Sequence, residues 1–586
     1  MKKNHSVITF LILISLLIAY LIYREGKTVR PEQVLFTTAG HVEMCLRCHV
    51  REKLDPAHDA SVIGCSPCHL GDGLAIDKQK AHKGMVLNPG DLRVAEQTCG
   101  TSGCHPTDIH KVKNSLMATN RGILATLLYY WGQADTQNGN YSVEELIKSG
   151  ENSLALDYYR KLCATCHLWK QKNDLPGYDP FFNEKGGGCS ACHYVNPEKE
   201  EPPVAVPPYP AESHIAPLKK PHPLISKKVP EENCVRCHNR SGRIGLSYRG
   251  QFEAEGYGTP YEEGTLSSRQ LPGNRFYLEI ADDVHHKKGM ACIDCHTRDE
   301  IMGDGNNYAH YEDQLEISCE ACHDANPGLT RKERVMINIS RQEKGEYVLT
   351  GKLDGKKRPL KLPKAESCGY PGHKRLTCEA CHSTWVPQCY GCHVQKDDTS
   401  EQLDKLTLLE TKGEWSEGRS YIRYEKPMLA VWGPEIVIVT PGCQDVVNLI
   451  DSDGRVNKYF NRFTMAAINP HTTQAKGRSC EDCHASPKTV GLGEGTIYSR
   501  EGKWFFNPVD RGVETLAGRT VSLDAFVSLE GEALQHASRP ELRPFNKEEL
   551  LRILRVGLCV QCHGDYADPA YRDYTPQTKC PKYREP

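Results

Sequence analysis

One short string dominates this chain: two cysteines separated by two residues, with a histidine directly after the second cysteine. It occurs eleven times in 586 residues that contain 27 Cys and 25 His, whereas composition alone gives about 0.05 matches. A twelfth copy is stretched, with four residues between Cys99 and Cys104. The chain must therefore fold so that twelve thiol pairs each lie beside a histidine. The cysteines are Cys45 and Cys48, Cys65 and Cys68, Cys99 and Cys104, Cys163 and Cys166, Cys189 and Cys192, Cys234 and Cys237, Cys292 and Cys295, Cys319 and Cys322, Cys378 and Cys381, Cys389 and Cys392, Cys480 and Cys483, and Cys559 and Cys562.

This string is the attachment site of c-type haem, in which both thiols bond the porphyrin and the histidine ligates the iron. A zinc site would need a second ligand pair at a set distance and has no use for the adjacent histidine. A disulfide framework would not repeat one spacing so strictly. We therefore expect about twelve covalently attached haems. The expected proximal iron ligands are His49, His69, His105, His167, His193, His238, His296, His323, His382, His393, His484 and His563.

Thirteen histidines remain outside the strings, and His5 precedes an apolar N-terminal segment. The other twelve equal the number of haems, so we expect a histidine on both sides of every iron. Such irons have no open position, and they exchange electrons instead of binding substrate. We expect no catalytic residue. The candidate distal ligands are His41, His58, His82, His110, His214, His222, His285, His286, His310, His373, His471 and His536.

Residues 6–23 carry no charge and are just long enough to span a bilayer as a helix. They lack a clear cleavage site, so we expect an uncleaved anchor in the cytoplasmic membrane, with a removed signal peptide as the alternative. Because haem c is attached outside the cytoplasm, the body is expected in the periplasm. No basic run suggests nucleic-acid binding.

The expected fold is a multihaem cytochrome c, made mainly of short helices and irregular loops around haems, with small antiparallel β insertions in the C-terminal half. The expected parts are an anchor at 1–30, a five-haem domain at 31–195, a Pro-rich crossing segment at 196–230, a central five-haem domain at 231–400 and a two-haem domain at 401–586.

Local patterns predict several elements. Capping signals at Ser142 and Asn546 predict helices that lead to the strings at Cys163 and Cys559. Alternating apolar residues predict strands at 335–339, 347–354, 436–440 and 446–450. Cys368 and Cys443 lie outside the strings, either as a disulfide or as two separate thiols, and Cys580 carries no readable signal.

The chain resembles the large multihaem c-type cytochromes of respiratory bacteria, including those of metal respiration and of selenite or tellurite reduction operons. The resemblance lies in Asp283-Val-His-His-Lys-Lys-Gly-Met-Ala-Cys292-Ile-Asp-Cys-His296 and in His471 leading into Gly477-Arg-Ser-Cys480-Glu-Asp-Cys-His484. It implies electron transfer between a quinol-oxidising membrane subunit or other cytochromes and a downstream acceptor. The alternative is a reductase or oxidase of a small nitrogen, sulfur or selenium compound at one open haem.

Overall fold

The computed structural model of the chain describes residues 12–21, 35–49, 54–101, 103–172, 180–195, 222–240, 244–253, 268–271, 275–343, 345–363, 371–501, 503–510, 512–514, 520–560, 562–564 and 568–571. These residues form two compact units. Unit 1 comprises Met1–Pro89 and Asn196–Ile225, and unit 2 comprises Gly90–Val195 and Ser226–Pro586. The expected crossing segment at 196–230 is therefore divided between the two units, and most of it lies outside the described residues.

Unit 1 is built from short elements around two strings. Glu43 is buried, and its carboxylate accepts backbone hydrogen bonds from Cys45 (3.3 Å), Cys65 (2.8 Å) and Ser66 (3.0 Å). One side chain thus fixes the start of both strings. The elements are a 3₁₀ turn at Met44–Arg47, α2 (Ala60–Ile63), α3 (Ser66–His69), α4 (Lys78–Ala81) and the short strand β2 (Leu224–Ile225).

Unit 2 begins with helices whose ends follow capping chemistry. Ser142 Oγ accepts from the backbone of Glu145, and Asn546 and Glu549 cap each other reciprocally, so both predicted helix starts are confirmed. The helix that starts after Asn546 reaches Cys559 as predicted, but the one that starts after Ser142 ends at Ser149 and does not run on to Cys163. The helices are α5 (Pro106–Asn114), α6 (Leu116–Thr119), α7 (Arg121–Tyr130), α8 (Val143–Ser149), α9 (Leu154–Tyr158), α10 (Pro180–Asn183), α11 (Ser190–His193), α12 (Glu231–Val235), α13 (Gly245–Tyr248), α14 (Val284–Lys287), α15 (Cys292–Cys295), α16 (Arg298–Met302), α17 (Tyr311–Gln314), α18 (Glu320–His323), α20 (Cys378–His382), α21 (Cys480–His484) and α22 (Lys547–Val560).

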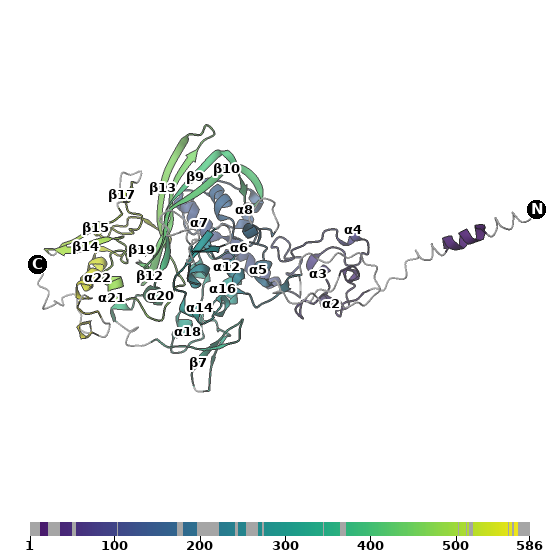
Figure 1. Cartoon of the computed structure of the whole chain (residues 1–586), viewed down its shortest axis with the longest axis horizontal. Helices are drawn as coiled ribbons and strands as arrows, with labels where there is room; N and C mark the ends of the chain where they lie inside the picture. Colours follow the sequence, from purple (N-terminus) through teal and green to yellow (C-terminus); the bar gives the residue numbers. More distant parts are fainter. Residues whose placement is uncertain are drawn as a thin grey trace, which may run out of the picture. The chain divides into compact units, whose positions relative to one another are not determined.

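A seven-stranded mixed sheet forms the largest element of unit 2 (Figure 1). Its order is β10-β9-β12-β11-β19, and β13 pairs with both β12 and β18. β9 and β12 are parallel, although most other pairs are antiparallel. The strands are β9 (Val386–Asp404), β10 (Leu409–Glu425), β11 (Met428–Trp432), β12 (Glu435–Ile450), β13 (Val456–Ala467), β18 (His536–Ala537) and β19 (Leu542–Arg543).

Smaller strand groups complete unit 2. A three-stranded sheet has the order β3-β5-β4, another has the order β6-β7-β8, and two hairpins are β14–β15 and β16–β17. The bounds are β1 (Tyr194–Val195), β3 (Gln251–Glu253), β4 (Ser268–Leu271), β5 (Arg275–Glu279), β6 (Ile339–Arg341), β7 (Tyr347–Thr350), β8 (Lys357–Pro359), β14 (Gly495–Arg500), β15 (Lys503–Pro508), β16 (Val513–Glu514) and β17 (Thr520–Val521).

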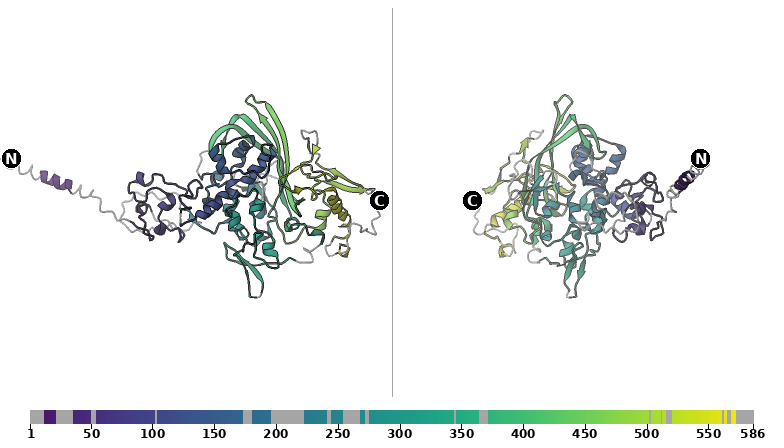
Figure 2. Two further views of the ribbon diagram at one scale, coloured as in Figure 1. Left: turned by 180° about the vertical axis from the view of Figure 1, so that it is seen from behind. Right: turned by 45° about the vertical axis from the view of Figure 1, so that its right-hand side comes forward.

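Helices pack against the large sheet at two places. Trp131 and Tyr158, from the α7–α9 region, contact Trp415 of β10, and Phe460 of β13 joins this cluster. Leu550 and Leu554 of α22 pack in a second cluster with residues of β11 and β12. Figures 1 and 2 show the long strands between the early helices of unit 2 and the C-terminal α22.

The expected fold class is therefore wrong. The chain is not mainly short helices and loops with small β insertions, because long strands of a mixed sheet occupy residues 386–467. The two strands predicted at 436–440 and 446–450 form one continuous strand, β12, in which an irregularity between Pro441 and Gln444 absorbs the Pro-Gly break. The prediction at 347–354 is confirmed for Tyr347–Thr350, whereas the strand predicted at 335–339 starts only at Ile339.

The predicted transmembrane anchor is also wrong. Residues 12–21 are helical. Nowhere in the described part of the chain is a helix both long and apolar enough to cross a membrane. The rest of the predicted anchor, residues 6–11 and 22–23, lies outside the described residues.

Candidate functional site: the thiol–histidine strings and the cavity between them

Most strings fold into a single helical turn. The backbone N–H of the string histidine donates to the carbonyl of the first cysteine, as from His296 to Cys292 (3.0 Å) and from His323 to Cys319 (2.8 Å). Side chains three residues apart on such a turn lie on one face, so the two thiols point to the same side. The stretched string closes in the same way, since His105 N donates to Cys99 O (2.8 Å). Its longer loop therefore brings the same groups together.

Five string histidines face a spare histidine across a nearly constant gap. An imidazole nitrogen bonds a first-row metal at about 2.0 Å and the ring centre lies roughly 1.1 Å farther away, so two rings on one iron have centres about 6.2 Å apart. The pairs have ring centres 5.9–6.2 Å apart: His49 with His82, His69 with His222, His296 with His471, His323 with His285, and His484 with His373. The first two pairs lie within unit 1 and the other three within unit 2.

Each such pair offers two protein ligands, which is the number that a haem iron takes. Among the residues that the structure describes, no three or more His, Cys, Asp or Glu side chains converge as a metal-ion site. Burial lowers the pKa of His373 to about 4 and also lowers the pKa of His471. These imidazoles are therefore neutral at pH 7, which is the form that binds a metal.

In many of these histidines, the ring nitrogen Nδ1 lies within hydrogen-bonding distance of a protein acceptor. Nδ1 lies 2.8 Å from Val86 O in His69, 2.9 Å from Gln474 O in His382 and 3.0 Å from Ile553 O in His484. A carboxylate takes the carbonyl's place at His285 (Asp283), His296 (Glu300) and His563 (Asp568). Such a bond fixes the ring and leaves Nε2 able to bind a metal, as in known histidine-ligated metal sites.

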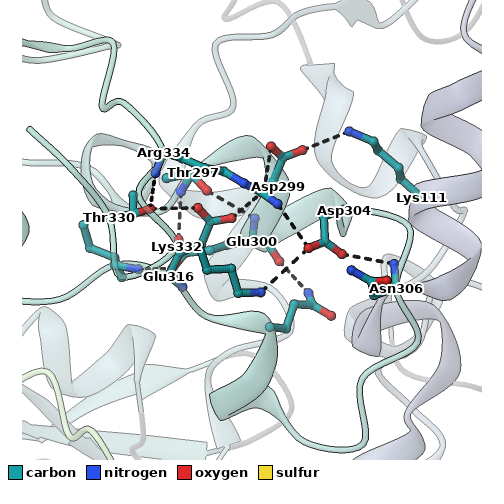
Figure 3. Close-up of polar contacts among 12 residues, drawn as sticks. Lys111, Thr297, Asp299, Glu300, Asp304, Asn306, Glu316, Thr330, Lys332 and Arg334 are labelled. Atoms are coloured by element: carbon teal, nitrogen blue, oxygen red, sulfur yellow. Dashed lines mark hydrogen bonds and ion pairs between the residues drawn. The ribbon is translucent and has the colours of Figure 1, made fainter.

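Glu300 shows how firmly one of these acceptors is held. It also accepts from the backbone of Thr297 (2.8 Å), Glu316 (2.5 Å) and Ile317 (2.5 Å). Burial alone would raise its pKa, but the hydrogen bonds outweigh burial and lower it. Beside it, Arg334 bridges Asp299, Asp304 and Glu316, and Lys111 contacts Asp299 (Figure 3). The sequence analysis did not single out Glu300. Its position, four residues after His296, could have indicated the contact, because side chains four residues apart on a helix are neighbours.

A large cavity lies among the described residues of unit 2. Its volume is about 3090 Å³, several times the roughly 300–1,000 Å³ of an ordinary small-molecule pocket. His285, His296, His323, His373 and His471 line it, as do residues of seven strings, those that begin at Cys163, Cys189, Cys234, Cys292, Cys319, Cys378 and Cys389. The strings therefore open into one continuous space that is large enough for several planar cofactors.

Neighbouring strings are close to one another as well. Their sulfur atoms lie within hydrogen-bonding reach at four places: Cys99 with Cys189, Cys166 with Cys237, Cys234 with Cys292, and Cys319 with Cys378. Cofactors bonded to these sulfurs would have adjacent edges.

The string at Cys389 differs from most others in conformation, since it lies within β9 and not in a helical turn. Cys392 is the parallel register partner of Asp445 on β12. Cys443 lies two residues before Asp445 on the same strand. Asp445 is only 2% exposed and accepts from Trp131 Nε1 (3.2 Å). Burial raises the pKa of Asp445 from 3.8 to about 7, despite this bond. Cys368, the other half of the possible disulfide with Cys443, lies outside the described residues, as does Cys580.

We expect Asp445→Asn to change the pH dependence of stability. The unfolded chain releases this proton near pH 4 and the folded chain only near pH 7, so stability falls by about 4 kcal/mol as pH rises through that window. Asparagine can keep the Trp131 bond without this loss. Thermal unfolding should show a variant equal to the parent at pH 4 and clearly more stable at pH 8. Equal melting temperatures at pH 8 would contradict a buried, neutral Asp445.

The other distal candidates contact residues outside the strings. His286 packs against Tyr248 (5.1 Å between ring centres), His536 against Tyr130 (5.8 Å), and His310 Nε2 lies 2.9 Å from Asn138 Oδ1. His58 contacts Asp55 (2.8 Å), His110 lies near Asn114, and the backbone N–H of His41 donates to Thr37. His214 lies outside the described residues.

Comparison of the chain with known protein families, with curated proteins and with solved structures finds no match.

Proposed function

We propose that this chain is a multihaem c-type cytochrome that carries about twelve covalent haems and transfers electrons along them between redox partner proteins. The five histidine pairs at iron-ligating separation support this proposal most directly. Each pair joins a histidine of a string to one outside the strings. Attachment by cysteine and ligation by two histidines are thus compatible at the same place.

Haem supplies one-electron chemistry, and the residues of the chain supply spacing and tuning. A second histidine closes the iron to substrate, which favours electron transfer over catalysis. Acceptors such as Glu300 at His296 increase the basicity of the ligand and so favour the oxidised iron. The adjacent sulfurs of successive strings support short steps between cofactors. The resemblance of the strings to those of large respiratory cytochromes points the same way.

The proposal predicts about twelve haems per chain. The protein should be produced in a bacterium with the haem c attachment machinery, and covalent haem should be counted by the pyridine haemochrome assay and intact mass. We expect about twelve covalent haems per chain. The irons with paired histidines should give low-spin EPR signals. A matched preparation with Cys292 and Cys295 changed to alanine should carry one fewer. A chain with zinc or disulfides and no covalent haem would overturn the proposal.

A further inference from the structure

The segment around the strand β8 contacts both sides of one histidine pair, His285 with His323. Arg358 of β8 donates from Nε to the carbonyl of Lys288 (2.9 Å), directly after α14, the helix that carries His285. Shortly after β8, the carbonyl of Lys361 lies 2.6 Å from His323 Nδ1. The same short stretch of chain is therefore fixed to both expected ligands of one iron.

This segment is also strongly basic. Residues 331–361 contain ten Lys and Arg but only four Asp and Glu, in a chain whose formal net charge is −2. Lys332, Arg334 and Arg358 form ion pairs with carboxylates of unit 2. Other cations of the segment are exposed and form no ion pair with a carboxylate of the described residues: Arg331, Arg341, Lys356, Lys357 and Lys361.

Several of these exposed cations border the large cavity. Arg331, Lys357 and Lys361 line it, as do both histidines of the pair. Leu362 lines it too and is 58% exposed, so an apolar side chain lies beside the cations. Figure 1 shows β7 and its neighbouring strands projecting from unit 2 next to α18. One expected haem is thus bordered at the protein surface by positive charge and by apolar atoms.

Carboxylates at this place do not offset the positive charge. Asp283 is buried and bound to a histidine of the pair, and Asp354 forms an ion pair with Arg358 (2.6 Å). Glu320 and Asp324, on and directly after α18, are exposed. Two such groups are too few to cancel an excess of ten cations over four anions in residues 331–361.

We propose that Arg331, Lys356, Lys357, Lys361 and Leu362, here called the β8 surface, form the docking site of an acidic electron-carrier protein. The inference rests on the proposed function. One electron would pass from the reduced carrier to the ferric haem expected at the adjacent histidine pair, which gives the oxidised carrier and a ferrous haem and breaks no bond. Complementary charges accelerate the encounter of two proteins and orient them. Since the β8 surface adjoins both ligands of one iron, the acidic face of a carrier would be held beside that haem.

The test measures electron transfer by stopped flow to the haem-loaded protein. The probe is a reduced plant-type [2Fe–2S] ferredoxin, an acidic protein whose low potential favours transfer to the haems. At low ionic strength, we expect the double variant Lys357→Glu/Lys361→Glu to lower the second-order rate constant about tenfold or more. The double variant Lys357→Gln/Lys361→Gln should lower it less. Both differences should fade at high salt, because salt screens exposed charges.

The matched control is Lys458→Glu/Lys503→Glu, which changes the net charge equally through two exposed lysines on β13 and β15. It should leave the rate constant with ferredoxin within about twofold of the parent, since steering depends on charges near the docking site. A basic carrier, mitochondrial cytochrome c, should show no decrease with the Lys357→Glu/Lys361→Glu variant. Haem count and low-spin EPR signals equal to the parent show that the variants keep their irons ligated.

Three results would overturn the inference in variants with the full haem count. The first is a rate constant with ferredoxin equal to that of the parent. The second is an unchanged rate constant with a shifted potential of one haem, which would mean that the cations bind its propionates. The third is an unchanged rate constant with lost binding to phosphatidylserine vesicles, which would mean that the β8 surface contacts a lipid surface. A parent chain that carries no covalent haem would instead refute the proposed function.

Discussion

Replacing His471 by glycine should open one iron per chain. His471 faces His296 with ring centres 6.2 Å apart, and its Nδ1 contacts Asn469 O (2.9 Å). Without this ring, the iron ligated by His296 would lose its second strong ligand and become high-spin. Glycine is the appropriate replacement, since residue 471 has φ of +56°, a conformation that glycine adopts without strain. We expect one additional high-spin signal and one additional carbon monoxide-binding haem relative to the parent.

A methionine at the same position provides the control. His471→Met can keep the iron six-coordinate, so it should bind no additional carbon monoxide, while the potential of one haem rises. Gly477→Ala would be a poor control, because a Cβ there would lie 2.8 Å from the sulfur of Cys381. If His471→Gly binds no more carbon monoxide than the parent, then His471 does not ligate an iron and its pairing with His296 has another cause.

The strings could be recognised in the sequence, because each is encoded in five consecutive residues, or in seven for the stretched copy. The helix starts at Ser142 and Asn546 could be predicted for the same reason, since a capping residue and its partner are three positions apart. The pairing of string histidines with spare histidines could not be predicted, because residues such as His296 and His471 come together only through the tertiary fold.

The large sheet could not be predicted because its pattern is interrupted. β9 contains Pro387, Gly391 and the string at Cys389, and its second half alternates among charged and polar residues. The apolar alternation that marks a half-buried strand is therefore broken. Its burial comes from partners far along the chain, as when Val394 packs in the same cluster as Trp131 and Trp415.

The chain without attached haem should not reach this fold. Without haem, the cavity of about 3090 Å³ would hold water against walls that include apolar side chains such as Leu116, Leu315 and Ile438. The removal of apolar surface from water, which stabilises a folded domain, would then be missing in this part of unit 2. Under the proposed function, we therefore expect filling by haem to be a condition of folding as well as of electron transfer.

Expression of the same sequence with and without the haem attachment machinery tests this directly. The haem-free chain should lack near-ultraviolet circular dichroism and be digested by protease at least tenfold faster than the haem-loaded protein. Unit 1 carries its own two histidine pairs, so a variant that lacks only the cysteines of its two strings should lose protection there while the β sheet of unit 2 remains protected. A haem-free chain that resists protease as well as the loaded protein would mean that side chains alone sustain the fold. The strings would then be additions to a pre-formed scaffold, and the histidine spacings would be set by packing alone.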